Sequence, residues 1–271
     1  TLHVFVAGAF DTAVGELPGS SCMGLHAQAA MDAVADAGLA PADIDGVDNA
    51  GVSPVELAHY LGIKPTYADG TSVGGCSFML HVRHAAAAIN EGLATTILIT
   101  HGESGRSRVG AGGFARSASS LMGQFEMPYG VTSPPTMFTV PVLRYLKARG
   151  YTVEDLANVA VIQREWAALN PRASFKDPLT IADVMNADMI AWPFTKLMCC
   201  LVTDGGGALI LTSAERAKDF PQKPVYILGT GESVETPMVS QMYDFTSSTA
   251  FRISGKKASD EAGISYADGD H

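Results

Sequence analysis

The chain carries near its N-terminus the segment Ala33-Val34-Ala35-Asp36-Ala37-Gly38-Leu39-Ala40-Pro41-Ala42-Asp43-Ile44-Asp45, and near its C-terminus the related segment Ala258-Ser259-Asp260-Glu261-Ala262-Gly263-Ile264-Ser265-Tyr266-Ala267-Asp268-Gly269-Asp270. Six of the thirteen aligned positions are identical, and a constant shift of 225 residues relates them. The strand-like run before each segment also matches, because Val4–Gly8 corresponds to Val225–Gly229 at a shift of 221 residues. This internal repeat predicts a duplicated βα unit. The alternative is that both segments are unrelated helix ends of the same Ala-Gly-Leu type.

The duplication predicts how the chain is divided. We expect a first half at residues 1–103, an inserted loop or lid domain at 104–194, a hairpin that returns to the first half at 195–214, and the start of a second half at 215–271. The second copy ends at His271, at the point where the first copy continues into its next strand. We therefore expect the second half to be incomplete in this chain, and the part outside it to carry some of any active site.

The composition excludes several classes of protein. With 47% hydrophobic and 17% charged residues, most of the 271-residue chain can form a folded core. The formal net charge of −10 opposes binding to the phosphate backbone of nucleic acids. The longest apolar runs, such as Thr96–Thr100, fall far short of the roughly 18 residues that a membrane span needs, and no basic segment precedes the first apolar run. The cysteines form no CxxC pair, which indicates a reducing, cytoplasmic setting.

Short β-branched runs alternate with longer helical patterns in the N-terminal part of the chain. This alternation predicts an α/β domain with a mixed or parallel sheet. Val4–Gly8 and Thr95–Thr100 are expected strands, and Ser77–Glu91 is an expected helix. A further helix is expected at Cys22–Gly38, with its apolar face formed by Met23, Ala27, Ala30, Met31 and Val34.

The segment Thr71-Ser72-Val73-Gly74-Gly75-Cys76-Ser77-Phe78 leads into an alanine-rich helix. A strand that ends in two glycines and opens a helix directs backbone N–H groups and the positive end of the helix dipole at whatever lies there. A cysteine at such a position can act as a nucleophile, so Cys76 is a candidate catalytic residue. Gly74, Gly75 and Ser77 are candidate substrate-binding residues. The alternative is that Cys76 is a small buried hydrophobe in a tight turn.

These features resemble the thiolase superfamily, and more narrowly its branch related to sterol-carrier-protein thiolases, whose members are described as acetyl-CoA acetyltransferases or lipid-transfer proteins. The matching blocks cover nearly the whole chain and are Ala37–Asp45, Gly74–Phe78 with the alanine helix, Gln124–Gly130, Trp166–Pro171 and Cys199–Thr212. The resemblance implies an α/β fold with two βαβαβ halves in α-β-α-β-α layers and an inserted loop domain, the second half being truncated here. It also implies coenzyme A thioesters as substrates, no bound cofactor or metal, a homodimer paired near Tyr67–Val73, and a substrate-binding role for Tyr129.

The sequence departs from the family pattern at the nucleophile. In thiolases the reactive cysteine lies three residues after an Asn, Ser or Thr and two residues before a Ser or Thr. Counted from Ser72 and Ser77, that position is Gly75, and Cys76 is one residue late. The family's second-half motifs, which supply the general base and oxyanion hole, are absent from this chain. We therefore predict that Cys76 is not an obligatory covalent nucleophile.

Three histidines are further candidates for acid–base chemistry. His101 follows a buried strand at its C-terminal end, where the sites of α/β proteins gather, and is a candidate catalytic residue. His81 and His84 lie on the alanine-rich helix and are more typical of packing or interface residues than of bases.

The remaining candidates concern phosphate binding. Leu197–Leu211 is expected to form a hairpin whose turn contains Gly205 and Gly206, which resemble a phosphate cradle as well as a turn. Arg106 and Arg108 lie in a glycine-rich loop and are candidates for contact with coenzyme A phosphates, although a solvated loop is the alternative. We expect this loop to become ordered when a thioester binds.

Two enzymatic hypotheses and one non-enzymatic hypothesis follow. The first is an acyltransferase of the thiolase type that makes or breaks a C–C bond next to a thioester carbonyl. The second is a retro-aldol lyase that acts on sterol-like CoA thioesters with a partner carrying an OB-fold and a zinc ribbon. The third is a catalytically silent scaffold that binds acyl-CoA or lipid. The residues do not identify the acyl chain or the direction of the reaction.

Overall fold

The computed structural model describes residues 2–110 and 117–269. The chain forms two compact units. Unit 1 comprises residues 1–112, 202–232 and 253–271, and unit 2 comprises residues 113–201 and 233–252. Within the described ranges, no helix combines the length and apolar character needed to cross a membrane.

Unit 1 is built on a six-stranded mixed sheet. Its strands, in spatial order, are β3 (Tyr67–Asp69), β2 (Gly46–Asn49), β4 (Thr96–Ser104), β7 (Asp204–Ser213), β1 (Val4–Asp11) and β8 (Val225–Tyr226). Strand β2 runs parallel to β3 and β4, whereas β7 is antiparallel to both β4 and β1. The mixed α/β sheet predicted from the alternating pattern is therefore present, and its parallel part ends where α/β proteins place their sites.

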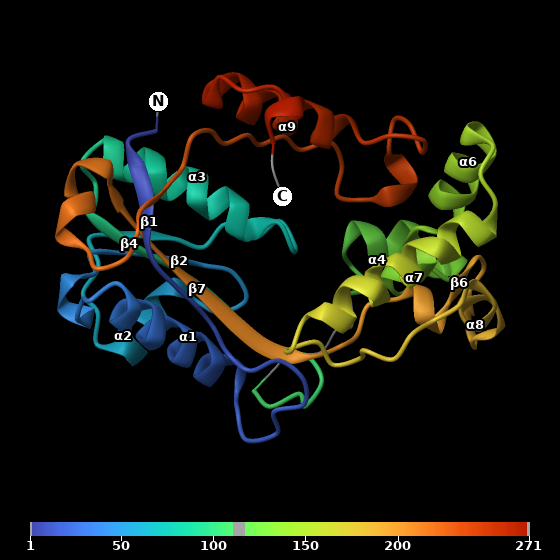
Figure 1. The fold of residues 1–271 in the computed structure, drawn as a ribbon, viewed down its shortest axis with the longest axis horizontal. Coiled ribbons are helices and arrows are strands. Elements are labelled where there is room, and N and C mark those ends of the chain that lie inside the picture. The colour runs from blue at the N-terminus through green and yellow to red at the C-terminus, as the bar shows by residue number, and fades with distance from the viewer. Residues whose placement is uncertain (1, 111–116, 270–271) are drawn as a thin grey trace. The chain divides into compact units, whose positions relative to one another are not determined.

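Helices cover both faces of this sheet (Figure 1). Helices α1 (Cys22–Asp36) and α2 (Pro54–Leu61) lie on one face, and α3 (Ser77–Asn90) lies on the other. The strands supply alternate residues to the two cores, as the two-residue period of a strand requires. Leu98 belongs to the core under α1, whereas Ile97 and Ile99 pack with the alanines of α3.

The buried face of α1 differs from the predicted one. Ala30 and Val34 are buried as expected, but Met31 is 42% exposed. In an alanine-rich helix many positions are apolar enough to face a core, so periodicity alone does not select the face. The structure places three alanines at the centre of the buried face, where α1 packs closely on the strands, with larger residues on either side of them. The buried face consists of Leu25, His26, Ala29, Ala30, Ala33 and Val34.

The structure confirms the duplication at the closest contact between strand and helix. A Cβ atom added to Gly8 would lie 2.6 Å from the carbonyl oxygen of Ala33. In the second copy, a Cβ atom added to Gly229 would lie 2.2 Å from the carbonyl oxygen of Ala258. Both glycines therefore permit the same close approach of the strand to the helix, at the two shifts found in the sequence.

Polar contacts repeat in the same way. The backbone N–H of Ala9 donates to Asp36 Oδ2 at 3.0 Å, and the N–H of Thr230 donates to Glu261 Oε2 at 2.7 Å. The two helices also end alike, since the glycine that follows each of them has a φ near +70°. The second helix is α9 (Thr249–Ala262). These matches exclude a chance similarity between helix ends.

The predicted hairpin turn at Gly205 and Gly206 is wrong. Both glycines lie inside the continuous strand β7, which pairs with β4 and β1 along its length. A Cβ atom on Gly206 would lie 2.6 Å from the carbonyl oxygen of His101 and 3.2 Å from that of Leu25. The glycine is needed there because the backbones of β4 and α1 approach β7 closely.

Unit 2 is mainly helical and contains one short antiparallel strand pair. Its α-helices are short except for α7, which begins after a capping box formed by Thr152 and Asp155. Its elements are α4 (Leu121–Phe125), α5 (Pro134–Met137), α6 (Thr139–Arg149), α7 (Val153–Leu169), α8 (Ile181–Asn186), β5 (Met189–Ala191) and β6 (Phe194–Thr195).

Candidate functional site

The candidate site of unit 1 lies at the carboxyl ends of the parallel strands β2, β3 and β4. Helix α3 begins at this edge, a few residues after β3 ends. Of its first four backbone N–H groups, those of Ser77, Met79 and Leu80 donate to the carbonyl oxygens of Gly74 and Cys76. The N–H of Phe78 has no acceptor among the described residues, so it is available to an anion or a polarised carbonyl group.

The turn before α3 is held by a small set of hydrogen bonds. The Ser77 hydroxyl donates to the Gly74 carbonyl at 2.6 Å and accepts from the N–H of Val73 at 2.9 Å. Gly74 has a φ of +91°, which a residue with a side chain rarely adopts. Ser77 is fully buried and Cys76 is exposed. The four residues predicted for this turn therefore come together, with Ser77 holding the loop and Cys76 facing outward.

Cys76 occupies the N-cap position of α3 but does not cap it through its side chain. Among the described residues, the one polar contact of its Sγ atom is a weak hydrogen bond to the Val73 carbonyl, at 3.9 Å. Gly75 lies beside it in open space, since no heavy atom would come within 4 Å of an added Cβ. The alternative of a buried, structural Cys76 is wrong, because the side chain is exposed.

His101 lies in β4 and contacts the first turn of α3. Its ring centroid is 4.4 Å from that of Phe78, and Glu103 Oε1 is 3.9 Å from its Nε2 atom. Burial lowers the pKa of His101, so the imidazole is neutral near pH 7. Its Nδ1 atom is buried and has no hydrogen-bond partner within the described part of the chain. The arrangement leaves a neutral imidazole that can accept a proton.

His26 is a buried neighbour that the sequence analysis did not identify. It projects from α1, and its Nδ1 atom is hydrogen-bonded to Thr100 Oγ1 at 2.9 Å. Burial, and secondarily the nearby His101 ring at 6.1 Å, lowers the pKa of His26 to about 4. A polar residue on the alanine-rich face of a helix is the only sequence feature that marks this position.

A second unrecognised group lies at the end of β2. Asp48 and Asn49 are fully buried, and their side-chain oxygen and nitrogen atoms have no hydrogen-bond partners in the described structure. Burial raises the pKa of Asp48 to about 8, and the charge of Asp69 acts in the same direction. Asp48 is therefore largely protonated at neutral pH, which is unusual for an aspartate. In the sequence these residues are marked by polar side chains that end an apolar strand.

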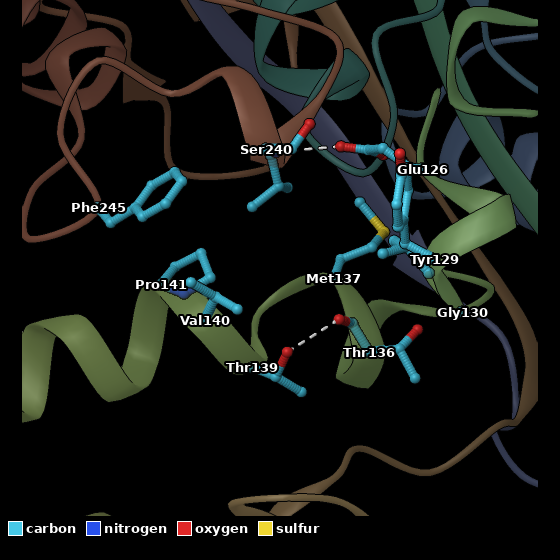
Figure 2. Close-up of a pocket in the computed structure, with 12 residues that line it drawn as sticks. Glu126, Tyr129, Gly130, Thr136, Met137, Thr139, Val140, Pro141, Ser240 and Phe245 are labelled. Atoms are coloured by element: carbon cyan, nitrogen blue, oxygen red, sulfur yellow. Dashed lines mark hydrogen bonds between the residues drawn. The ribbon is translucent and has the colours of Figure 1, made fainter. Parts of the chain in front are cut away.

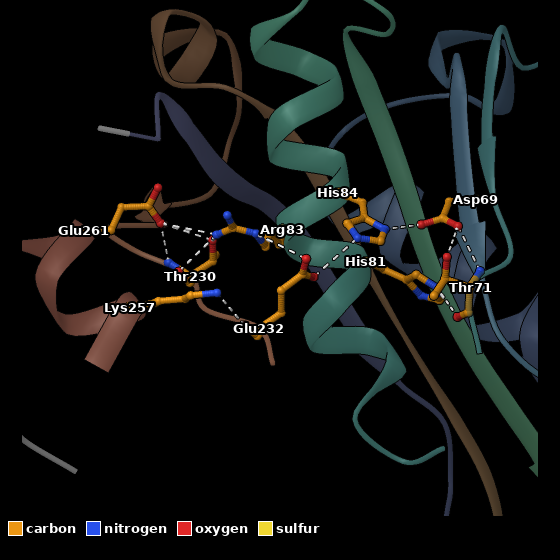
Figure 3. A network of polar contacts seen from close by, with 9 residues as sticks. All are labelled: Asp69, Thr71, His81, Arg83, His84, Thr230, Glu232, Lys257 and Glu261. Atoms are coloured by element: carbon orange, nitrogen blue, oxygen red, sulfur yellow. Dashed lines mark hydrogen bonds and ion pairs between the residues drawn. The ribbon is translucent and has the colours of Figure 1, made fainter. Parts of the chain in front are cut away.

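Polar contacts connect α3 to the second copy of the repeat (Figure 3). His84 Nδ1 lies 2.5 Å from Asp69 Oδ2, and its Nε2 atom lies 3.5 Å from Glu232 Oε2. Arg83 donates to Thr230 Oγ1 at 2.9 Å and lies 3.9 Å from Glu261 Oε2. The two residues thus bind α3 to the end of β3 and to the segment that follows β8.

His81 is also on α3 but faces the turn. Its Nε2–H donates to the Thr71 carbonyl at 2.9 Å, and burial lowers its pKa. His81 and His84 thus have structural contacts, as the sequence analysis favoured. No group of three or more His, Cys, Asp or Glu side chains among the described residues is placed to share a metal ion.

The loop that contains Arg106 and Arg108 is anchored by Asp204, the first residue of β7. The carboxylate accepts from the N–H of Arg106 at 2.7 Å, from Ser107, and from the N–H of Leu17. Although desolvation acts to raise it, these hydrogen bonds lower the pKa of Asp204 to about 2. The Arg106 side chain remains exposed, 3.8 Å from Glu16. Residues 111–113 of the same loop lie outside the described residues.

Tyr129 belongs to unit 2 and the other predicted residues belong to unit 1. It lies in a short 3₁₀ turn, is 87% exposed, and lines a cavity in unit 2. Gly205 and Gly206 lie in β7, where they serve close packing and form no phosphate-binding turn.

Comparisons with known proteins identify the family. No family model matches the chain. The "Steroid side-chain-cleaving aldolase" of Thermomonospora curvata is 31% identical over 280 residues, which cover 97% of this chain and 71% of the relative. An "Acetyl-CoA acetyltransferase" of Methanothermobacter thermautotrophicus is 29% identical over 253 residues, which cover 90% of this chain and 65% of the relative.

Solved structures show the same fold. The "Ltp2-ChsH2(DUF35) aldolase" aligns with a TM-score of 0.89 and 29% identity over 98% of this chain and 71% of that one. An SCP2-thiolase-like protein of Mycobacterium smegmatis aligns with a TM-score of 0.78 and 22% identity, over 98% of this chain and 58% of that one. The chain belongs to the thiolase superfamily. It lies in the branch related to sterol-carrier-protein thiolases, as its sequence blocks predicted.

In this member of the thiolase superfamily, the structure shows where the sequence differs from the family at the nucleophile position. The family frame counted from Ser72 and Ser77 falls on Gly75, in the last loop position before the N-cap of α3. A side chain at that position would meet open space, whereas the Cys76 side chain starts one residue later, where α3 begins. The relatives with aldolase names and those with acetyltransferase names both remain compatible with this arrangement.

Proposed function

We propose that the protein is an acyl-CoA enzyme that breaks a C–C bond next to the thioester carbonyl by retro-aldol chemistry. The observation that carries this proposal is the turn before α3. It has Gly75 at the nucleophile frame and an exposed Cys76 whose Sγ atom contacts only a carbonyl oxygen among the described residues. A thiolase-type mechanism needs a thiolate that a neighbouring base activates, and no basic side chain among the described residues is hydrogen-bonded to Cys76 Sγ.

The proposed reaction needs no covalent intermediate. A base removes the proton from the hydroxyl group on the β-carbon of a 3-hydroxyacyl-CoA. The C–O bond becomes a carbonyl as the bond between the α- and β-carbons breaks, and the electron pair moves to the α-carbon as a thioester enolate. Protonation of that carbon gives a shorter acyl-CoA and a ketone or aldehyde. No oxidant or reductant is consumed.

The chain contributes two elements to this scheme. The N–H of Phe78, which has no acceptor among the described residues, stabilises negative charge on the thioester oxygen together with the positive end of the α3 dipole. His101, which burial keeps neutral, is the group of this chain suited to accept the hydroxyl proton. Because the chain spans 65–71% of the two relatives described above, further groups can come from outside it.

Partners follow from the same comparison and from the sheet. The structure neighbour named "Ltp2-ChsH2(DUF35) aldolase" carries two protein names, which supports a partner protein for this chain. The OB-fold and zinc ribbon of that partner rest on the family resemblance. A homodimer is supported by β3, which lies at an edge of the sheet and pairs with β2 alone among the described strands. An uncovered edge strand invites pairing with a second copy. Arg106 or Arg108 would contact a phosphate group of coenzyme A.

The test is to supply the native protein, with and without its partner, with a 3-hydroxyacyl-CoA and separately with a 3-oxoacyl-CoA plus free coenzyme A. Retro-aldol chemistry predicts cleavage of the first substrate, unchanged within about twofold in Cys76→Ala. Cleavage of the second substrate, with an acyl adduct on Cys76 by intact mass, would contradict the proposal and favour a thiolase. Binding of acyl-CoA without turnover of either substrate would favour the scaffold hypothesis.

A further inference from the structure

Unit 2 contains a cavity of about 490 Å³ that none of the assignments above uses except at its rim, where Tyr129 lies (Figure 2). The cavity is lined from three parts of the chain, at residues 126–131, 136–141 and 239–245. Apolar groups dominate its wall, and they include Met137, Val140, Pro141, Val239 and Phe245. A volume of this size is within the range of roughly 300–1,000 Å³ that small-molecule sites occupy.

One carboxyl group lies in this apolar wall. Glu126 is 2% exposed, and its Oε1 atom accepts a hydrogen bond from the N–H of Ser240 at 3.0 Å. Its Oε2 atom is buried and has no hydrogen-bond partner within residues 2–110 and 117–269. Leaving such an oxygen unpaired is unfavourable, because the group loses its hydrogen bonds to water and gains none in the protein.

The backbone holds this side chain in place. The N–H of Glu126 donates to the Met122 carbonyl, and its carbonyl accepts from the N–H of Tyr129, both at 3.0 Å. With the backbone fixed on both sides and Oε1 bound to Ser240, the carboxyl group cannot turn to water without giving up its one hydrogen bond. The unpaired oxygen is therefore a fixed, covered acceptor in the wall of an otherwise apolar cavity, and a ligand would reach it by displacing the side chains that cover it.

We propose that this cavity binds a small apolar molecule that carries one hydroxyl group, and that the hydroxyl donates a hydrogen bond to Glu126 Oε2. The apolar wall takes up the hydrocarbon part of the ligand, and the carboxyl group selects for a donor. A hydroxyl fits better than an ammonium group, because removing an ion from water into an apolar cavity costs several kcal/mol per ion. A ligand carboxylate has no proton to donate when it is ionised, so it cannot satisfy the Oε2 atom.

This inference is independent of the proposed function. All the lining residues belong to unit 2, and apart from Tyr129, to which the resemblance gives a substrate-binding role, none of them takes part in the proposed C–C bond cleavage. If the cavity binds no hydroxyl-bearing ligand, the retro-aldol proposal is unaffected. If the protein shows no retro-aldol activity, the proposed ligand site in the cavity is equally unaffected.

Three rigid probes of the same shape test the proposal: 1-adamantanol, its methyl ether and 1-adamantylamine. The alcohol can donate a hydrogen bond, the ether can only accept one, and the amine is charged. Isothermal titration calorimetry on the whole chain measures each affinity, and the NMR shift of the Met137 methyl group reports whether the probe enters the cavity. We expect the alcohol to bind about tenfold more tightly than the ether, as one added hydrogen bond implies, and the amine to bind more weakly than the alcohol.

The variant Glu126→Gln tests the role of the carboxyl group. Its side-chain oxygen can keep the bond to Ser240, which turns the NH₂ group toward the ligand. That group donates to alcohol and ether alike, so the preference for the alcohol should disappear. Glu165→Gln makes the same chemical change at an exposed position of α7 and should retain the preference.

Three results would overturn the proposal. Equal affinity of the wild-type chain for alcohol and ether would show that no donor is selected. Tighter binding of the amine would identify a cation site. Absence of binding by all three probes would show that the cavity is not a ligand site. Because these comparisons use the wild-type chain, they remain decisive even if Glu126→Gln does not fold.

Discussion

The protonated carboxyl group of Asp48 makes a sharp prediction about stability and pH. Asp48 is fully buried at the end of β2, and neither of its carboxyl oxygens has a partner among the described residues. Replacement by asparagine keeps the size of the side chain and removes the titrating proton. The difference in unfolding free energy between the variant and the wild type should therefore depend on pH.

The size and sign of the effect follow from the two pKa values. The pKa of Asp48 is about 8 in the folded protein, against 3.8 for an unperturbed aspartate. Between these values the folded protein keeps a proton that the unfolded chain loses, so this stabilising contribution is complete below pH 3.8 and is lost as pH rises toward 8. The wild type should lose about 1.4 kcal/mol per pH unit relative to Asp48→Asn, or at most about 5 kcal/mol between pH 4.5 and 8.

Urea unfolding of both proteins at half-unit intervals from pH 4.5 to 8 measures this difference. His26 changes stability in the opposite sense, because its lowered pKa makes its contribution complete above pH 6.5 and lost as pH falls toward 4. Both proteins contain His26, so its contribution cancels in the difference. Glu91→Gln makes the same kind of change at an exposed position after α3 and serves as the control for the substitution itself.

A pH-independent difference between Asp48→Asn and the wild type would refute this reasoning. It would mean that Asp48 ionises in the folded protein as it does in the unfolded chain. Such a result would require water or another polar group at the carboxyl ends of β2 and β3, and the site would then be wetter than the described contacts indicate.

Three further predictions concern the turn, the repeat and the sheet edge. Gly75→Cys should fold with its stability unchanged within about 0.5 kcal/mol, because its Cβ meets open space. Intact mass should show that the new thiol forms an acyl adduct with acyl-CoA and that Cys76 does not. A reactive Cys76 beside an inert new thiol would contradict the placement of the family's nucleophile position at residue 75. Gly8→Ala and Gly229→Ala should each lower the unfolding free energy by about 1–3 kcal/mol, because the new methyl groups would lie 2.6 and 2.2 Å from carbonyl oxygens. An unchanged unfolding free energy in Gly229→Ala would mean that the second copy packs differently from the first. Light scattering at micromolar concentration should give a dimer, and a monomer would count against pairing at β3.

The duplication could be predicted from the sequence because its closest contacts are made by the repeated residues themselves. Gly8 and Gly229 face equivalent alanines, and Asp36 and Glu261 accept equivalent backbone hydrogen bonds. Each contact joins a strand to the helix of the same copy, so the residue types at both ends must repeat together.

The turn at β7 was mistaken for a hairpin because glycines have more than one use. Three successive glycines after Asp204 match a turn in composition. The structure uses Gly206 for the close approach of two other backbones, from β4 and α1, which lie about 100 and 180 positions earlier in the chain. No local pattern distinguishes the two uses.

The buried polar groups were missed for a related reason. Asp48 and His26 acquire their unusual pKa values from burial, which depends on strands and helices that are distant in sequence. Likewise Glu126 meets Ser240 across 114 positions of the chain. A residue type marks these positions as polar, but only the packing around them makes them chemically distinctive.

The contacts of α3 suggest how the repeat and the site depend on each other. The N-terminal end of this helix presents Gly75 and Cys76, while Arg83 and His84, about two turns further on, bind the second copy of the repeat. The ion pairs are partly exposed and so add little stability, about 0–1 kcal/mol each. Their main effect is positional, because the hydrogen bonds to Thr230 fix the rotation of α3 about its axis. That rotation determines which residue of the turn faces a substrate. It therefore decides whether Gly75, at the family's nucleophile position, or Cys76 meets the thioester.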